Sequence, residues 1–395
     1  MAERSGLEIA FITTFPPSTQ SLNEYGFHMV REFAANPEVA HVHVIADVLA
    51  GPVNELDLGE KVTVHRVWRF NAPGALFSIL GKLRQLKPDG ALFNVQTASF
   101  GDREIPAALG LLTPMVARWF ACPTGVLAHN WLVGVDLEHT VLKGQRLRQM
   151  IVKTGGAVVT RAMMAASYVT TTLQSYVDAL KPRYPRADLT LVPHGTFDTV
   201  ERAWVPLATR PHHIVTMGKF GTYKKLETLI DAFARLRKDP RFADYRLIIG
   251  GTDHPNTPGY VAGLQKAHAG DDGIVFHGYV AEDDVPRFFE TAQLSVFDYE
   301  ATTGSSGVLH QTASYGTLPV FPSIGDFVDV ARDEGITGYN YAPGDAADMA
   351  DAMSRALSDM DAAEARAKAN RDASLDMPLS KVVAFHVAKF SELSQ

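Results

Sequence analysis

The fold of this 395-residue chain is decided by the stretch "HHIVTMGKFGTYKKLETLIDAF", residues 212–233. It begins with an apolar run that is typical of a buried strand and continues through a glycine into a helical pattern. The apolar residues of that pattern follow the i, i+3, i+4, i+7 spacing of an amphipathic helix: Leu226, Leu229, Ile230 and Phe233. A strand followed directly by a helix is the repeating unit of a parallel sheet that helices cover on both faces.

The same alternation extends over the rest of the chain. Before residue 199 we expect strands at 7–15, 41–49, 62–68, 91–96, 125–130, 168–173 and 189–195. After residue 211 we expect strands at 212–220, 245–251, 273–280, 294–299, 318–324 and 339–343. The stretch between them, 199–211, contains two prolines and no clear period, so it is interpreted as a linker. The sequence therefore predicts an α/β chain of two Rossmann-like, doubly wound domains, residues 1–205 and 206–377, followed by a helix at 378–395.

Composition and charge narrow the class of protein. Hydrophobic residues make up 46% and charged residues 21% of the chain, as in ordinary soluble proteins. The net charge of -7 gives no general attraction to nucleic acid, so no nucleic-acid partner is expected. The single cysteine, Cys122, excludes an internal disulfide and fits a reducing compartment. No run approaches the roughly 20 apolar residues of a membrane span, and no signal peptide is visible, so we expect a cytoplasmic protein.

A glycine turn after the predicted strand 294–299 indicates an anion site. The turn is Gly-Ser-Ser-Gly, residues 304–307, and a short helix follows it and ends at Gly316. The first N–H groups of such a helix have no internal partner and lie at the positive end of its dipole, which favours phosphate. Lys219 and Lys224 follow the strand at 212–220 and would supply two cations for a diphosphate. The alternatives are an ordinary serine-capped helix and two solvated lysines.

These residues resemble a known family. The chain resembles the retaining, nucleotide-sugar-dependent glycosyltransferases of the GT-B fold, glycosyltransferase family 4, over nearly its whole length. The similar motifs are "VLAHN" (126–130), "GKFGTYKKLETLIDAF" (218–233), "IVFHGYV" (274–280) and "ITGYNYAPGD" (336–345). The resemblance implies that the first domain binds the acceptor, that the second binds the donor, and that the C-terminal helix packs back on the first.

The resemblance also assigns roles to individual residues. His129 would contact the donor sugar, and Lys219 and Lys224 would neutralise the donor diphosphate; these three are the implied catalytic residues. The donor-binding residues that the resemblance and the glycine turn indicate are Gly26, Gly278, Tyr279, Glu300, Thr303, Gly304, Ser305, Ser306, Gly307, Val308 and Gln311.

The sequence departs from the family at the two glutamates that usually flank the glycine turn and its helix. Thr303 and Gln311 occupy those positions, and Glu300 is the candidate substitute. Catalysis in which the leaving phosphate takes the acceptor proton depends on positioning and charge stabilisation more than on a dedicated base, so we expect activity to survive. In the first domain, Ser21 and Glu24 have the spacing of a capping box.

The expected ligands follow from the resemblance. The donor would be a UDP- or GDP-sugar, with no other cofactor and no metal, and the acceptor would be a hydroxyl in a glycan, glycolipid or glycoside. Residues 142–161 carry five basic side chains; they are either a solvated helix or a patch that meets anionic lipid at the inner face of the membrane and serves a lipid-linked acceptor. Two rival functions stay open, a nucleotide-sugar 2-epimerase of the same fold and a non-catalytic, sugar-nucleotide-binding partner subunit.

Overall fold

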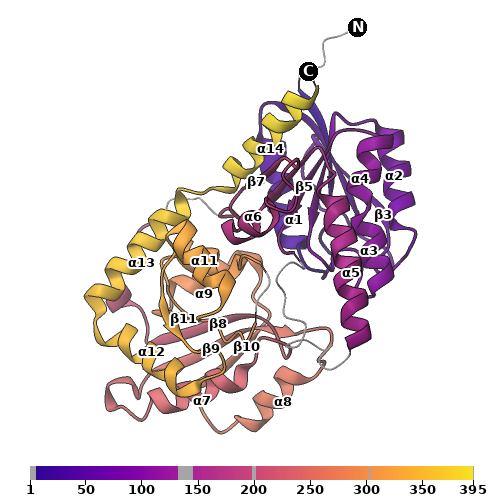
Figure 1. Cartoon of the computed structure of the whole chain (residues 1–395). Coiled ribbons are helices and arrows are strands. Elements are labelled where there is room, and N and C mark those ends of the chain that lie inside the picture. The colour runs from indigo at the N-terminus through magenta and orange to yellow at the C-terminus, as the bar shows by residue number, and fades with distance from the viewer. Residues whose placement is uncertain (1–5, 132–145, 198–201, 302–303, 395) are drawn as a thin grey trace. The chain divides into compact units, whose positions relative to one another are not determined.

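The computed structural model describes residues 6–131, 146–197, 202–301 and 304–394, and the side chains of α5 only from residue 154 on. The chain divides into two compact units (Figure 1). Unit 1 comprises residues 1–197 and 379–395, and unit 2 comprises residues 198–378. The sequence-predicted boundary after residue 205 thus lies a few residues inside unit 2.

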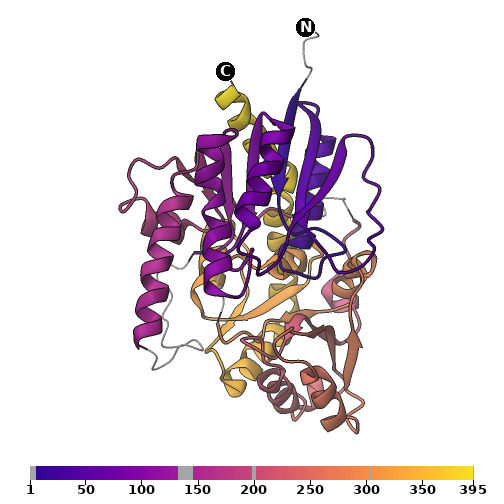
Figure 2. The same cartoon turned by 90° about the vertical axis from the view of Figure 1, so that its right-hand side faces the viewer.

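Unit 1 contains one parallel sheet of seven strands in the order β3-β2-β1-β4-β5-β6-β7. The strands are β1 (Leu7–Ile12), β2 (Val39–Asp47), β3 (Val62–Trp68), β4 (Gly90–Val95), β5 (Thr124–Ala128), β6 (Tyr168–Thr171) and β7 (Leu189–Leu191). The helices are α1 (Asn23–Ala35), α2 (Ala75–Leu86), α3 (Glu104–Leu111), α4 (Thr113–Phe120), α5 (Arg146–Met163), α6 (Gln174–Leu180) and α14 (Leu379–Ser394). Each of the seven predicted strands is present. The magenta helix α5 is most easily followed in Figure 2.

The C-terminal helix α14 completes the core of unit 1. Its Phe390 is fully buried against Gly90, where an added Cβ would lie 2.1 Å from the ring. One turn earlier, His386 makes a hydrogen bond of 2.9 Å with the hydroxyl of Tyr168 on β6. Residues from the two ends of the sequence therefore share one hydrophobic core.

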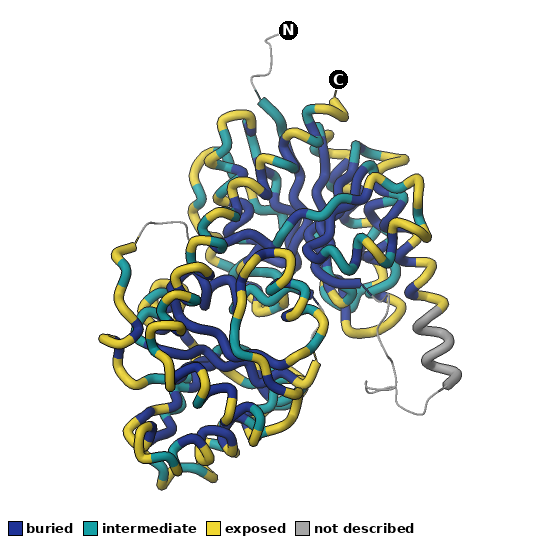
Figure 3. Tube along the Cα trace, turned by 60° about the vertical axis from the view of Figure 1, so that its left-hand side comes forward, coloured by how far each residue is buried: buried dark blue, intermediate teal, exposed yellow. Residues whose placement is uncertain are grey.

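Unit 2 contains a second parallel sheet, of six strands in the order β10-β9-β8-β11-β12-β13. The strands are β8 (His213–Phe220), β9 (Arg246–Asp253), β10 (Ile274–Gly278), β11 (Leu294–Val296), β12 (Leu318–Pro322) and β13 (Tyr339–Tyr341). The helices are α7 (Leu226–Leu236), α8 (Tyr260–Ala267), α9 (Val285–Glu290), α10 (Gly307–Ser314), α11 (Gly325–Glu334), α12 (Ala346–Ser358) and α13 (Met360–Leu375). The apolar stripe predicted for residues 226–233 is buried on α7, and the strands form the buried layer seen in Figure 3.

The strand orders indicate where a ligand can bind at the edge of each sheet. In unit 1 the chain moves outward in one direction from β1 and in the other from β4, and in unit 2 the same reversal occurs between β8 and β11. At such a switch point the neighbouring connections leave toward opposite sides, which opens a crevice at the carboxyl ends of the two strands. Ligand-binding residues are therefore expected beside these two strand pairs.

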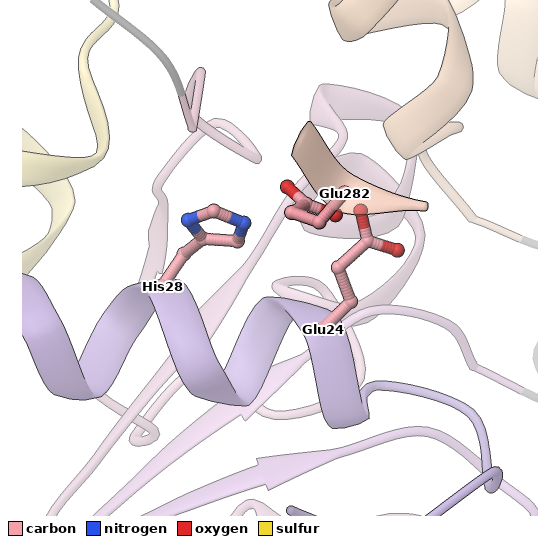
Figure 4. Close-up of side chains that lie close together, drawn as sticks. All are labelled: Glu24, His28 and Glu282. Atoms are coloured by element: carbon pink, nitrogen blue, oxygen red, sulfur yellow. The ribbon is translucent and has the colours of Figure 1, made fainter. Parts of the chain in front are cut away.

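One local prediction is wrong. The structure contains no capping box at the start of α1, because the helix follows Leu22, which adopts a left-handed conformation with a φ of 68°. Ser21 instead accepts a hydrogen bond of 2.6 Å from the Thr14 hydroxyl through its carbonyl oxygen. Glu24 and His28 project from the same side of α1, one turn apart (Figure 4). Among the described residues, no helix combines the length and the apolar character needed to cross a bilayer.

Candidate functional site

In unit 2 the segments that follow β8 and β11 lie side by side at the switch point. Lys224 and Tyr299 form an isolated antiparallel bridge, and the amide of Glu300 donates a 2.8 Å hydrogen bond to the carbonyl of Tyr223. The amide of Lys225 likewise donates to the carbonyl of Asp298 at 3.1 Å. These backbone contacts bring the predicted cation and the approach to the glycine turn to one place.

The Lys224 ammonium group is available to an anion. It lies 4.2 Å from the centroid of the Tyr299 ring and has no carboxylate within ion-pair distance in the described part of the chain. Gly218 leaves room for it, since an added Cβ there would lie 3.2 Å from Nζ. The neighbouring Lys225, in contrast, is paired with Glu300 at 2.9 Å. Glu300, the candidate substitute for a missing glutamate, is therefore already neutralised by a lysine.

A neutral histidine, His254, lies beside both predicted cations, Lys219 and Lys224. His254 follows β9, and its pKa is lowered by burial and then by the charges of Lys219 and Lys224. Its Nδ1 accepts a hydrogen bond from the Asn256 amide at 3.2 Å, so the neutral ring carries its hydrogen on Nε2. His254 can thus donate a hydrogen bond beside the two lysines without adding a charge.

Four side chains in the segments that follow β8 and β11 have buried polar atoms without hydrogen-bond partners among the described residues. They are the hydroxyls of Thr222, Tyr299 and Ser305 and the carboxylate of Asp298. Burial raises the pKa of Asp298 to about 7, although the charge of Lys224 opposes the shift. Unpartnered buried polar groups are rare in native proteins, and a cluster of them indicates a place where a polar ligand completes the bonding.

The start of α10 also has polar groups that lack hydrogen-bond partners in the described structure. Ser306 precedes the helix in an extended conformation without a side-chain cap, and no described group accepts the Gly307 and Val308 amides. The Tyr299 hydroxyl lies near the Ser306 side chain, which connects this end of the helix with Lys224. Gly304 adopts a φ of 114°, and its amide donates to the Asp326 carboxylate. Thr303 lies outside the described residues.

The remaining donor-binding candidates in unit 2 belong to β10, to the residue after it and to α10. Gly278 ends β10, the outer strand of the sheet, and the next residue, Tyr279, is 75% exposed. Such an exposed ring offers a stacking surface for a nucleobase. Gln311 is buried on α10, one turn after the unpartnered amides.

In unit 1 His129 is held by a chain of hydrogen bonds at the carboxyl ends of β1, β4 and β5. The Asn94 amide nitrogen donates to the Thr13 hydroxyl at 2.9 Å, so its oxygen accepts from His129 Nε2 at 2.7 Å. Burial lowers the pKa of His129 to about 3, which keeps the ring neutral at physiological pH. Its Nδ1 is then an acceptor, and it has no hydrogen-bond partner among the described residues.

Gly26 and an aromatic cluster surround this histidine. An added Cβ at Gly26 would lie 2.7 Å from the Thr13 hydroxyl, so the glycine lets α1 approach the loop after β1. The adjacent Tyr25 ring lies 4.5 Å from His129 and 4.7 Å from His194 between ring centroids. The structure therefore places Gly26 and His129 at one switch point of unit 1.

Sequence reasoning missed several residues of these two centres: Asn94, Thr222, His254 and Asp298. The signal for Asp298 is its position, because an acid directly after a buried apolar strand lies at the ligand-binding edge of a parallel sheet. Asn94 gives the same signal within "GALFNV" (90–95), where one amide interrupts an otherwise apolar strand.

Comparisons with known proteins agree with this architecture. Residues 211–359 match the family model described as glycosyl transferases group 1. Similar solved structures include sucrose-phosphate synthase from Thermosynechococcus elongatus, with a TM-score of 0.74 and 16% identity over 98% of each chain. HepE from Anabaena, in complex with UDP, has a TM-score of 0.69 and 15% identity over 98% of this chain and 100% of its own.

A third similar structure is WaaG, a glycosyltransferase involved in lipopolysaccharide biosynthesis, with a TM-score of 0.69 and 13% identity over 97% of this chain and 99% of its own. No curated protein sequence matches the chain. The two parallel-sheet units thus have the GT-B fold of glycosyltransferases.

The Lys224 ammonium group should contribute directly to the affinity for a nucleoside diphosphate. Lys224→Ala should weaken binding by about tenfold to a hundredfold, the range of a charge-assisted contact. Lys238 is the matched control, since it lies just past the other end of α7 and is exposed. Titration calorimetry should show Lys238→Ala binding as wild type; equal losses in both variants would contradict a specific role for Lys224.

The raised pKa of Asp298 should make the stability of the fold depend on pH. Because its folded pKa of about 7 lies above its ordinary value of 3.8, the stability that it contributes is full below about pH 4 and is lost as the pH rises toward 7. Chemical unfolding should show that the free energy of unfolding of the wild type falls by about 1.4 kcal/mol per pH unit in this window. In Asp298→Asn this fall should be absent.

Asp271 is the matched control for that experiment. Its hydrogen bond from Arg237 lowers its pKa, so Asp271→Asn should remove stability that is present above pH 4 and lost in acid, the opposite sign. A wild-type pH profile that persists in Asp298→Asn would show that this carboxyl group is not the one that titrates.

Proposed function

We propose that the protein is a retaining glycosyltransferase that moves a sugar from a nucleoside diphosphate to an acceptor hydroxyl. The observation that carries the proposal is the switch point of unit 2. There the Lys224 ammonium group, the first amides of α10 and several buried hydroxyls all lack partners within the part of the chain that the structure describes. Groups of these kinds bind a diphosphate. The family match at 211–359 and the GT-B fold support sugar transfer as the reaction.

The chemistry follows from the charge that develops on the donor. The bond between the anomeric carbon and the diphosphate oxygen breaks while the acceptor oxygen forms its bond to the same carbon. The leaving diphosphate gains negative charge and takes the acceptor proton. Lys224, the α10 amides and the Ser305 hydroxyl stabilise that charge, and neutral His129 accepts a hydrogen bond from a sugar hydroxyl through Nδ1.

The proposed donor is a UDP- or GDP-sugar, bound without a metal ion. Lysines and a helix N-terminus are a sufficient source of positive charge for a diphosphate. UDP is the first choice, because HepE has been solved with UDP and with UDP-glucose. The nucleobase would stack on Tyr279, and Gln311 would bind the ribose without a charge.

Thermal unfolding with a panel of UDP, GDP, ADP and dTDP and their sugars is the test. A ligand at about 100 times its dissociation constant adds about 2.7 kcal/mol to the native state, a readable shift. We expect a shift with one nucleotide class, and transfer of the radiolabelled sugar to an acceptor extract with retained configuration. Absence of any shift would overturn the donor site.

The rival functions give different results in the same assay. An epimerase would convert the sugar of its donor with no acceptor present, whereas a partner subunit would bind the nucleotide sugar without turnover. Product analysis by nuclear magnetic resonance separates all three outcomes.

We further propose a lipid-linked acceptor, reached by peripheral binding of unit 1 to the inner face of the membrane. The support is the end of α4, where Trp119 is 75% and Phe120 61% exposed. The Arg84 guanidinium carbon lies 5.7 Å from the centroid of the Phe120 ring, and Arg118 is also exposed. Exposed aromatic rings beside arginines suit the interface of an anionic bilayer. WaaG, which has a similar fold, serves lipopolysaccharide biosynthesis.

Vesicle sedimentation tests this contact. Wild-type protein should sediment with vesicles of phosphatidylglycerol and phosphatidylcholine but not with phosphatidylcholine alone. Trp119→Ala should reduce the bound fraction severalfold, whereas Val328→Ala, which removes an exposed apolar group from α11 in unit 2, should not. Equal binding to both vesicle types would contradict the proposal.

Of the basic segment 142–161, residues 142–145 and the side chains of 146–153 lie outside the described part.

A further inference from the structure

A buried acid–base pair lies directly behind the glycine turn. His310 of α10 is 2% exposed and Glu334 at the end of α11 is 7% exposed. His310 Nε2 lies 2.6 Å from Glu334 Oε2, and the other carboxylate oxygen has no hydrogen-bond partner among the described residues. A buried histidine of α10 is therefore anchored by a residue from the next helix, α11.

The second ring nitrogen of His310 bonds the glycine turn itself. His310 Nδ1 lies 2.9 Å from the carbonyl oxygen of Ser306, the residue that precedes α10. Because a carbonyl oxygen only accepts, Nδ1 carries a hydrogen whether the proton shared with Glu334 sits on the imidazole or on the carboxylate. The bond to Ser306 thus survives either arrangement of that proton.

The groups around His310 favour the charged ring. Burial by itself lowers the pKa of His310, but the Glu334 carboxylate and the Ser306 carbonyl outweigh burial, so the pKa is raised. From α13, the Ser374 hydroxyl donates a hydrogen bond of 3.5 Å to the backbone carbonyl of His310, not to its ring. Glu334 is accordingly the one titratable group that faces the ring in the described structure.

The bond to Ser306 fixes the direction of an amide in the proposed donor site. In a trans peptide the C=O of one residue and the N–H of the next point in opposite directions. Holding the Ser306 oxygen against His310 therefore turns the Gly307 N–H away from the helix, toward the side where an anion would lie. The Leu309 and His310 amides also donate to this oxygen, at 3.0 and 3.3 Å. These two hydrogen bonds belong to the first turn of α10 and form when the helix forms.

We propose that His310, anchored by Glu334, is a positioning residue that presents the Gly307 amide to the donor phosphate. This role rests on the proposed donor site and refines it, since the pair lies outside the site and acts through the backbone. It explains why a polar ring and an acid occupy buried positions where apolar residues would pack without desolvating two charges.

The experiment compares two variants of the His310–Glu334 pair: one removes both polar side chains, and the other removes only the carboxylate. In His310→Leu/Glu334→Met both partners become apolar at similar volume, a replacement that leaves such folds intact or more stable. In Glu334→Gln the amide can donate to Nε2 while Nδ1–H still bonds Ser306, so the geometry is kept and the charge removed. Tyr168→Phe is the control, because it removes a buried hydrogen bond to histidine in unit 1.

The readouts are calorimetric affinities for inorganic pyrophosphate and for the best nucleoside diphosphate, the melting temperature, and the ¹⁵N signals of the His310 ring. The double variant should lose about tenfold or more in pyrophosphate affinity while its melting temperature is kept, and Glu334→Gln should stay within about twofold of wild type. The ring signals should show hydrogen on Nδ1 at pH 8 in wild type and in Glu334→Gln. Tyr168→Phe should lower only the melting temperature.

Each contrary result has its own meaning. Unchanged pyrophosphate affinity in a folded double variant, or a ring without hydrogen on Nδ1, would overturn the positioning role and leave the donor site standing. A wild-type protein that binds neither pyrophosphate nor any nucleoside diphosphate would overturn the donor site and, with it, the role of His310.

Discussion

The rest of the structure depends on the reversal of strand order within each parallel sheet. Neighbouring connections that leave toward opposite sides open the sheet at one point, and only there can side chains and loop amides reach a common ligand. In unit 2 this point lies between β8 and β11, where Lys224, Asp298 and the glycine turn meet. In unit 1 it lies between β1 and β4, beside Thr13, Asn94 and Gly26. The two units share a plan but differ in chemistry.

That chemical difference is a matter of charge. The centre in unit 1 consists of neutral groups, an amide and a hydroxyl that hold a histidine whose burial keeps it uncharged. The centre in unit 2 holds an ammonium group that has no ion-pair partner in the described ranges, next to a carboxyl group that burial keeps close to protonation. A neutral centre suits recognition of hydroxyl groups, whereas an uncompensated cation suits a ligand that carries its own negative charge.

The sequence predicted the sheets better than the sites, for a physical reason. Strands such as β4 and β8 are apolar along most of their length because both faces are covered, and this pattern is local. Lys224 was predicted because glycine, strand and helix signals surround it. Glu334 was not, because it is 24 residues from His310 and only the packing of α10 on α11 joins them. The capping box failed because the left-handed Leu22 starts α1 one residue later than the Ser21–Glu24 spacing suggested.

The return of α14 to unit 1 makes that unit discontinuous in sequence, with residues 198–378 inserted between its two parts. During synthesis, unit 2 is complete in the nascent chain before Phe390 exists to cover Gly90. Unit 1 must therefore wait with part of its sheet exposed while the inserted unit acquires its structure. Unit 1 can thus be completed only after all of unit 2 has been synthesised, and a nascent chain stalled before α14 would present an unfinished apolar face to chaperones.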